Sequence, residues 1–364
     1  GRSPAGSVTS PQLVLVFGNR KLLEEKERFE EIKSFYPKAQ IVSVSTSGEI
    51  IGRKVQDETI VINAIEFEKT EVKLIKLNRS DFESSRDLGG QMSSKLNTED
   101  LRHILVFSDG GLVNGSELVK GLNNGLPENV AVTGGLAGDD ARFEKTLIGL
   151  NEAPSSGNVV GIGLYGADLK IGYGSAGGWE AFGPKRRITK SKGNVLMELD
   201  NKSALELYKL YLGDMAKELP GAALRFPLSV ELAEGDKPLV RTILTIDEES
   251  QTMTFAGDLP EGSTVRFMKA NFDKLIDAAG DAANSGRLNI RNSNPELAIL
   301  ISCVGRKLVL DQMVEEEVES TSEIIGSAVN QIGFYSYGEI SPWADSVNCE
   351  LHNQTMTITI FSEH

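Results

Sequence analysis

The sequence contains few of the residues that the commonest catalytic, redox and metal-binding chemistries need. Its 364 residues include three histidines and two cysteines, Cys303 and Cys349. These cysteines are too far apart for a CxxC redox pair, and two cysteines alone form neither a zinc cluster nor a disulfide framework. The GxxxxGKS/T phosphate loop, the HExxH zinc motif and the GxSxG serine motif are absent as well. These absences favour a non-enzymatic protein.

The chain also lacks long apolar runs and an excess of positive charge. No apolar stretch approaches the ~18 residues that suggest a membrane span, and the first residues show no basic-then-apolar signal pattern. With 38 basic and 52 acidic residues, the net charge of −14 argues against binding to a nucleic-acid backbone. We therefore expect a cytoplasmic protein that contacts neither membrane nor nucleic acid, and the scarcity of cysteine fits a reducing compartment.

The overall composition predicts a folded chain. Hydrophobic residues make up 40% of the sequence and charged residues 25%, which is close to the average for globular proteins. A chain of this length is expected to form two cores or one large core built from internal repeats. The small and polar segment at residues 1–10 is expected to be a tag remnant or a disordered tip.

A threefold recurrence is the most informative internal feature of the sequence. Short β-rich runs alternate with segments of helical period, which is typical of an α/β or α+β protein. Each unit reads strand, helix, strand, glycine-acid turn and strand, and the units begin at Leu13, His103 and Leu297. The predicted fold therefore has mixed β-sheets with helices, in two packed halves built from recurring β-α-β-β units. The alternative is a common wiring that recurs without functional meaning.

The second strand of each unit ends in a turn that carries a carboxylate. These carboxylates are Glu49, Asp139 and Glu339. If the units are equivalent, the three turns cluster at one edge, and the carboxyl ends of strands are the usual place for a ligand crevice. Gly134 and Gly135, in the strand before Asp139, are candidate ligand-binding residues, or simply glycines that a turn with positive φ requires.

Two residues at the start of a predicted helix suggest anion binding. Cys303 follows the apolar strand 297–302, and a helix N-terminus lowers the pKa of a thiol and favours anions. Arg306 adds a cation that suits a carboxylate. Cys303 is accordingly a reactive thiol or an anion contact, and the alternative is a small buried hydrophobic residue.

Three more side chains are candidates for a ligand site. His352 precedes the last strand, where it is a ligand contact or a hydrogen-bonded structural histidine. Trp179 lies beside a glycine-rich stretch and forms either a core cap or a stacking platform. Tyr335 alternates with Tyr337 along a strand, so that one ring is expected to face a pocket and the other the core.

Several motifs together resemble FIST domains. The segments GFYSYGEI at residues 333–340 and CELHNQTMT at residues 349–357 are similar to the C-terminal part of that family. The segments FSDG at residues 107–110 and GGLAGD at residues 134–139, with further matches over residues 178–200, are similar to its N-terminal part. The resemblance covers nearly the whole chain.

The resemblance implies a FIST N-terminal half at residues 11–200 and a C-terminal half at residues 201–364. It further implies a sensory input module of bacterial signal transduction that binds small ligands such as amino acids. Some relatives resemble haem-dependent nitric-oxide sensors that regulate histidine kinases and cyclic-di-GMP enzymes, which would then be the partners. No cofactor is expected unless haem binds, in which case His352 is the candidate axial ligand.

The residues and the resemblance together suggest an amino-acid-like ligand. Such a ligand needs a cation for its carboxylate and an acid for its ammonium group. Arg306, with the turn that begins at Cys303, is the candidate cation, and Glu339 or Asp139 is the candidate acid. Three other classes stay open: a haem-based gas sensor, an enzyme with Cys303 as nucleophile and His352 as base, and an interaction scaffold that uses the acidic helix 307–325.

Overall fold

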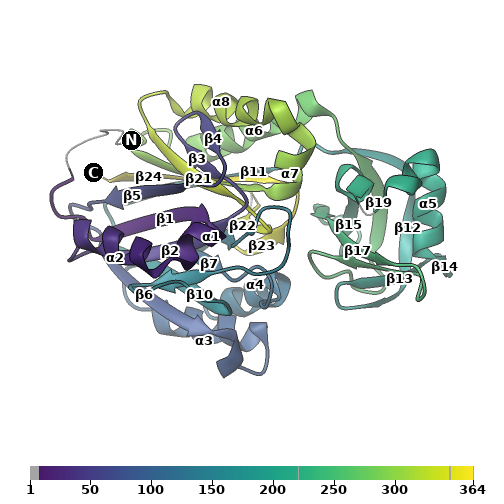
Figure 1. The fold of residues 1–364 in the computed structure, drawn as a ribbon, viewed down its shortest axis with the longest axis horizontal. Coiled ribbons are helices and arrows are strands. Elements are labelled where there is room, and N and C mark those ends of the chain that lie inside the picture. Colours follow the sequence, from purple (N-terminus) through teal and green to yellow (C-terminus); the bar gives the residue numbers. More distant parts are fainter. Residues whose placement is uncertain (1–7, 220, 344–345, 364) are drawn as a thin grey trace.

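A computed structural model describes residues 8–219, 221–343 and 346–363. It has a large body and a smaller lobe (Figure 1). The lobe consists of residues 180–269, which follow strand β11 (Leu169–Ala176) of the body and precede its helix α6 (Phe272–Asn289). Residues 1–7, within the tip predicted from the sequence, lie outside the described residues.

The body is built from three units, and each unit contributes three strands to a sheet of its own. In every unit the first two strands are parallel, and the third is antiparallel to the first. The recurring pattern predicted from the sequence is therefore confirmed, in an α+β fold with mixed sheets. The strands are β1 (Leu13–Asn19), β2 (Gln40–Thr46) and β5 (Ile60–Ile65) in unit 1, β7 (Leu101–Ser108), β8 (Ala131–Leu136) and β10 (Asn158–Tyr165) in unit 2, and β20 (Leu297–Cys303), β21 (Asn330–Ser336) and β24 (Met356–Glu363) in unit 3.

Each unit also completes the sheet of another unit. Strand β3 (Glu49–Ile51) leaves unit 1 and pairs with β21 of unit 3, while β22 (Gly338–Pro342) leaves unit 3 and pairs with β8 of unit 2. Strand β9 (Ile148–Leu150) leaves unit 2 and pairs with β2 of unit 1, so the exchange runs once around all three units. The sheets are extended by β4 (Lys54–Gln56), β6 (Glu71–Asn78), β11 and β23 (Cys349–His352).

Three backbone hydrogen bonds close this exchange where the second strands end. In each unit an amide in the turn after the second strand donates to a carbonyl at the corresponding strand end of another unit. Because every unit both donates and accepts, no strand end can shift without breaking its contacts to both neighbours. The bonds join Ser47 N to Tyr335 O (2.8 Å), Tyr337 N to Leu136 O (3.2 Å) and Gly138 N to Ser45 O (2.8 Å).

The central core lies where the three sheets meet. One phenylalanine from each unit, namely Phe17, Phe107 and Phe334, is fully buried there, and the ring centroids lie 4.8–6.1 Å apart. Gly135 leaves room for a neighbouring side chain at this point, since a Cβ atom on it would lie 2.8 Å from Cγ2 of Ile301. Gly135 thus serves the packing of the core.

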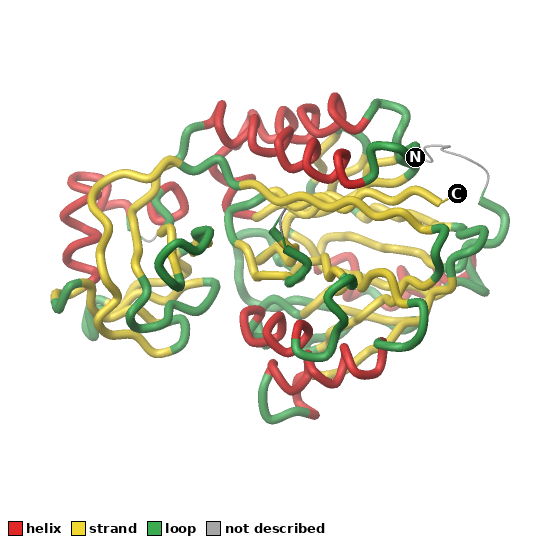
Figure 2. The backbone as a smooth tube through the Cα atoms, turned by 180° about the vertical axis from the view of Figure 1, so that it is seen from behind, coloured by secondary structure: helices red, strands yellow, loops and turns green. Residues whose placement is uncertain are grey.

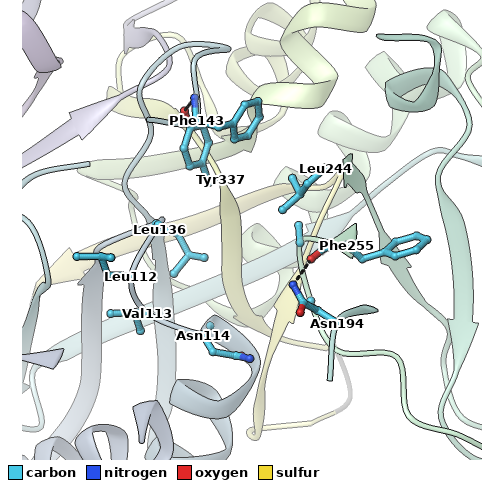
Figure 3. Close-up of a pocket in the computed structure, with 14 residues that line it drawn as sticks. Leu112, Val113, Asn114, Leu136, Phe143, Asn194, Leu244, Phe255 and Tyr337 are labelled. Carbon is cyan, nitrogen blue, oxygen red and sulfur yellow. Dashed lines mark hydrogen bonds between the residues drawn. The ribbon is translucent and has the colours of Figure 1, made fainter. Parts of the chain in front are cut away.

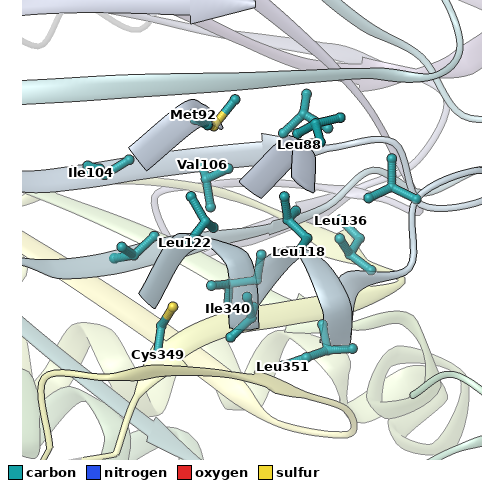
Figure 4. Close-up of a cluster of buried hydrophobic side chains, with 14 of the residues drawn as sticks. Leu88, Met92, Ile104, Val106, Leu118, Leu122, Leu136, Ile340, Cys349 and Leu351 are labelled. Atoms are coloured by element: carbon teal, nitrogen blue, oxygen red, sulfur yellow. The ribbon is translucent and has the colours of Figure 1, made fainter. Parts of the chain in front are cut away.

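Helices cover the outer faces of the sheets (Figure 2). Asparagine side chains cap three of them: Asn19 Oδ1 accepts from Lys21 N at the start of α1, Asn114 Oδ1 from Glu117 N at the start of α4, and Asn271 Oδ1 from Lys274 N at the start of α6. Leucines of α3 and α4 pack on the sheet of unit 2 in the core shown in Figure 4. The helices of the body are α1 (Arg20–Glu24), α2 (Lys26–Phe35), α3 (Ser85–Leu96), α4 (Gly115–Asn123), α6, α7 (Val304–Leu310) and α8 (Val314–Ile325). Within the described ranges, none of the helices has the length and apolarity needed to cross a bilayer.

The lobe has its own sheet and its own core. Helix α5 (Ala204–Leu212) packs against the sheet, and aromatic side chains such as Tyr208, Phe255 and Phe267 are buried between them. The strands are β12 (Glu180–Lys192), β13 (Val195–Leu199), β14 (Lys202–Ser203), β15 (Leu228–Glu231), β16 (Leu239–Arg241), β17 (Ile243–Asp247), β18 (Thr252–Phe255) and β19 (Thr264–Lys269).

We predict that Gly134→Ala and Gly333→Ala destabilise the protein by at least about 2 kcal/mol. The two glycines occupy equivalent positions in β8 and β21, and a Cβ atom on either would lie 1.8 Å from a backbone carbonyl oxygen of the adjacent strand. Gly134 also has φ +150, which alanine rarely adopts. Urea unfolding checks this, with Gly90→Ala in α3 as the control because a Cβ atom there meets only an ordinary contact. Equal stability of all four proteins would contradict the prediction.

Candidate functional site

A cleft of about 320 Å³ lies between the body and the lobe (Figure 3). The loop after β7 forms one wall, and a turn after β18 forms the other. Since both parts of the molecule line it, a molecule bound there would touch both. The lining residues are 110–115, Leu136, Phe143 and Tyr337 of the body and Asn194, Leu244 and 255–257 of the lobe.

The wall on the body side is a fixed glycine loop. The buried Asp109 accepts hydrogen bonds from Gly111 N (2.8 Å) and Leu112 N (2.7 Å) through Oδ1 and from Gly157 N (2.8 Å) through Oδ2. Gly110 lies so close to the neighbouring strand end that a Cβ atom would be 2.1 Å from Ala137 O. Asp109 therefore fixes the loop, and the glycine at position 110 lets it approach the end of the neighbouring strand.

An aromatic pair closes one end of the cleft. The rings of Phe143 and Tyr337 are stacked, with centroids 4.4 Å apart and an interplanar angle of 20°. The Tyr337 hydroxyl accepts a hydrogen bond from Phe143 N (3.0 Å), and burial raises the pKa of Tyr337, so that the hydroxyl stays neutral. Phe143 itself remains 46% exposed.

The chemistry of the cleft is apolar with a few amide groups. Leu112 and Leu244, from opposite sides of the cleft, are 62% and 37% exposed. Asn194 donates from Nδ2 to Phe255 O (2.7 Å), and Asn114 is the other side-chain amide. None of the described residues that line the cleft is charged. This arrangement suits a small, neutral and partly apolar molecule.

Comparison with known protein families shows which family the chain belongs to. Residues 12–202 match the FIST N domain and residues 204–342 match the FIST C domain. The chain belongs to the FIST family. FIST domains are associated with sensory signal transduction. The division between the two matched domains falls inside the lobe described above.

The FIST chain also has a relative in Methanocaldococcus jannaschii, an uncharacterized protein. The two are 24% identical over 348 residues, which cover 86% of this chain and 66% of the relative. The chain therefore spans slightly less than two thirds of that relative's length.

Of the residues predicted from the sequence, Arg306 and Tyr335 lie in a buried ionic network of the FIST body. Arg306 donates to Glu317 Oε2 from Nε (3.0 Å) and Nη2 (2.8 Å), and to the carbonyl oxygens of Gly177 and Leu275. Tyr335 Oη donates to Glu317 Oε1 (2.7 Å). Arg306 is fully buried, and these acceptors take the place of the ligand carboxylate that we expected it to bind. Glu317, from the acidic helix, is also fully buried.

Glu339 and Glu49 occupy equivalent positions, and each is hydrogen-bonded to two hydroxyl side chains. Ser336 Oγ (2.7 Å) and Thr355 Oγ1 (2.8 Å) are hydrogen-bonded to the Glu339 carboxyl group, and Thr46 and Thr59 are bonded in the same way to Glu49. Burial raises the pKa of Glu339 to about 8 and also raises that of Glu49. These carboxyl groups hold the turns of the exchange in place and are bound within the body.

Asp139 is likewise held by protein groups. It is fully buried and accepts from Arg20 Nε (2.9 Å) and Arg142 Nη1 (3.0 Å). The hydrogen bonds of the three turns align Asp139 with Gly48 and Gly338, one position before the glutamates. Asp139 therefore differs in register from the carboxylates with which the sequence analysis grouped it.

Trp179 lies at the junction of body and lobe. Its Nε1 donates to Gln354 O (2.8 Å), and its ring packs with Met268 of the lobe and with Leu275 and Leu310 of the body. Trp179 therefore joins the two parts at the point where the chain crosses between them.

Cys303 and His352 do not have the properties of a nucleophile and a base. Burial raises the pKa of the Cys303 thiol, so that the thiol stays protonated and unreactive at neutral pH. His352 is buried with Nε2 2.8 Å from Ser341 O, and burial lowers the pKa of its ring to about 4. Its neutral ring therefore donates to that carbonyl.

Haem, which the resemblance allows, does not fit the described histidines. An axial ligand needs a free ring nitrogen that faces a cavity. His352 and His103 are both buried among protein groups, and neither of them lines the cleft. His364 lies outside the described residues. In the part of the chain that the structure describes, no group of three or more His, Cys, Asp or Glu side chains is placed to hold a metal ion.

Arg306→Ala is expected to destabilise the protein by about 3–5 kcal/mol, because it leaves the buried Glu317 without its cation. Chemical unfolding measures this, and the control is Arg28→Ala, which removes only exposed ion pairs on α2. An Arg306→Ala protein as stable as the wild type would show that the ion pair is not structural.

Glu339→Gln is expected to reduce the loss of stability between pH 5 and pH 8. In the folded protein the Glu339 carboxyl stays protonated up to about pH 8, whereas an unfolded chain ionises it near its ordinary pKa of 4.5. The contribution of this group is therefore fully present below about pH 4.5 and is lost as pH rises through about 8.

The measurement is the difference in unfolding free energy between the wild type and Glu339→Gln across this range. Taking the difference removes the opposite effect of the buried histidines, whose lowered pKa values act below about pH 6.5. Glu31→Gln on the exposed face of α2 should leave the curve unchanged. A constant difference between wild type and Glu339→Gln would exclude the raised pKa.

Proposed function

We propose that this FIST chain is a non-enzymatic sensory module that binds a small ligand in the cleft between body and lobe. The observation that supports this proposal is that partly exposed apolar side chains from both parts, including Leu112, Phe143 and Leu244, line one cleft. Apolar surface that is open to water on both walls gains free energy when a ligand covers it.

The lining also narrows the chemistry of the ligand. The amino-acid-like ligand expected from the sequence would carry a carboxylate and an ammonium group, and none of the described lining residues is charged. A group that is charged loses its hydration in such a cleft without gaining an opposite charge. We therefore favour a ligand without net or separated charge.

Occupancy of the cleft can be relayed through the polar contacts that tie the lobe to the body, which include bonds from Asn114 and Lys120 to Asp258 and from Lys274 to Glu180. Arg241 of β16 donates from Nη1 to Leu351 O (2.9 Å), and Asp258 N donates to Ser116 Oγ (3.3 Å). A ligand that touches both walls favours whichever placement of the lobe gives it more contacts. A signalling partner, such as a histidine kinase or a cyclic-di-GMP enzyme, would respond to that placement.

A thermal-shift screen with neutral metabolites tests this proposal on three proteins. Ala256→Trp places a large side chain in the lobe wall of the cleft, and Leu210→Trp places the same side chain on the exposed face of α5. We expect a ligand to raise the melting temperature of the wild type and of Leu210→Trp, but not that of Ala256→Trp. If every stabilising compound acts equally on Ala256→Trp, the binding site lies elsewhere.

A further inference from the structure

The aromatic pair at the end of the cleft has one ring face that the protein does not cover. Tyr337 is only 8% exposed because Phe143 is stacked on it, whereas Phe143 is 46% exposed and lines the cleft. In Figure 3 the Phe143 ring lies on the side of Tyr337 that faces Leu244 of the lobe. A large aromatic face that stays open toward a cleft offers a platform for another ring.

The position of this platform is fixed before any ligand arrives. Phe143 has φ +55, a left-handed conformation that a phenylalanine adopts only when its surroundings impose it. The hydrogen bond from its amide to Tyr337 Oη holds the residue there, and the buried Asp139 accepts from Lys145 N two residues later. Binding to this ring therefore costs little ordering of the loop.

The rest of the cleft suits a neutral ring that carries a polar group. Leu112 and Leu244 offer apolar contact, and a charged ring would meet no opposite charge among the lining residues that the structure describes. Asn194 uses one N–H of its Nδ2 for Phe255 O, so that its Oδ1 and its second N–H can bond to a polar group of a ligand. The volume of about 320 Å³ is at the small end of ligand pockets and suits one or two fused rings.

We infer that the ligand carries a neutral planar ring, one or two fused rings in size, which stacks on the open face of Phe143 and places a hydroxyl or similar polar group toward the Asn194 amide. This inference rests on the proposed function, because it names the class of molecule that the cleft takes. Phe143 is then a specificity-determining residue that selects planar over puckered molecules of equal size.

Calorimetric titration with 2-naphthol and with decahydro-2-naphthol tests the inference, because the two molecules share a neutral hydroxyl donor and differ in planarity. We expect wild type to bind 2-naphthol about tenfold more tightly than its saturated analogue. Phe143→Leu should remove most of this preference, since it keeps an apolar side chain and loses the ring. Phe143→Tyr should retain the preference. Phe35→Leu, on the exposed face of α2, is the matched control and should behave as wild type.

The outcomes separate this inference from the proposed function. If Phe143→Leu keeps the full preference while Ala256→Trp abolishes binding, the cleft is the site and the stacking inference is wrong. If neither substitution affects binding, both the inference and the proposed site are wrong. Absence of saturable 2-naphthol binding to the wild type also overturns the inference, and the thermal-shift screen then decides the proposed site by itself.

Discussion

The structure depends on the exchange of short strands among its three units. Each unit leaves its second strand without a neighbour on one side, and a strand from another unit satisfies those backbone groups. The three amide-to-carbonyl bonds at the strand ends close the exchange. The sheets, the central phenylalanine cluster and the loops at the strand ends all take their positions from this arrangement.

The cleft is a consequence of that framework. The loop after β7 lies at the carboxyl end of parallel strands, where Asp109 and the following glycines hold it close to the turn of unit 2. Tyr337 comes from the equivalent turn of unit 3, so that two units build the body wall together. The lobe adds the opposite wall through Leu244 and a short turn after β18.

The sequence alone predicted the repeated units, because alternating apolar strands and helical periods are local signals. It also grouped Glu49 with Glu339, whose environments match, but it misplaced Asp139 by one position. The prediction for Arg306 failed for a physical reason. A charge-based argument treats an acid-rich helix as solvated, whereas one glutamate of that helix, Glu317, turns inward and pairs with Arg306. No local pattern marks such a pair.

The sequence did not reveal which lobe residues line the cleft, because Asn194 and Leu244 are far from residue 110 along the chain and no local pattern links them. The lobe is inserted in the connection from β11 to α6, which precedes unit 3. The equivalent connection before unit 2, from β6 to α3, is short and contains the 3₁₀ turn Arg79–Asp81. The chain leaves and re-enters the body at adjoining points, since Gly178 packs directly against Lys274. The lobe can consequently lengthen, shorten or change its lining in evolution while the strand register of the body stays the same, so that recognition diverges on a constant scaffold.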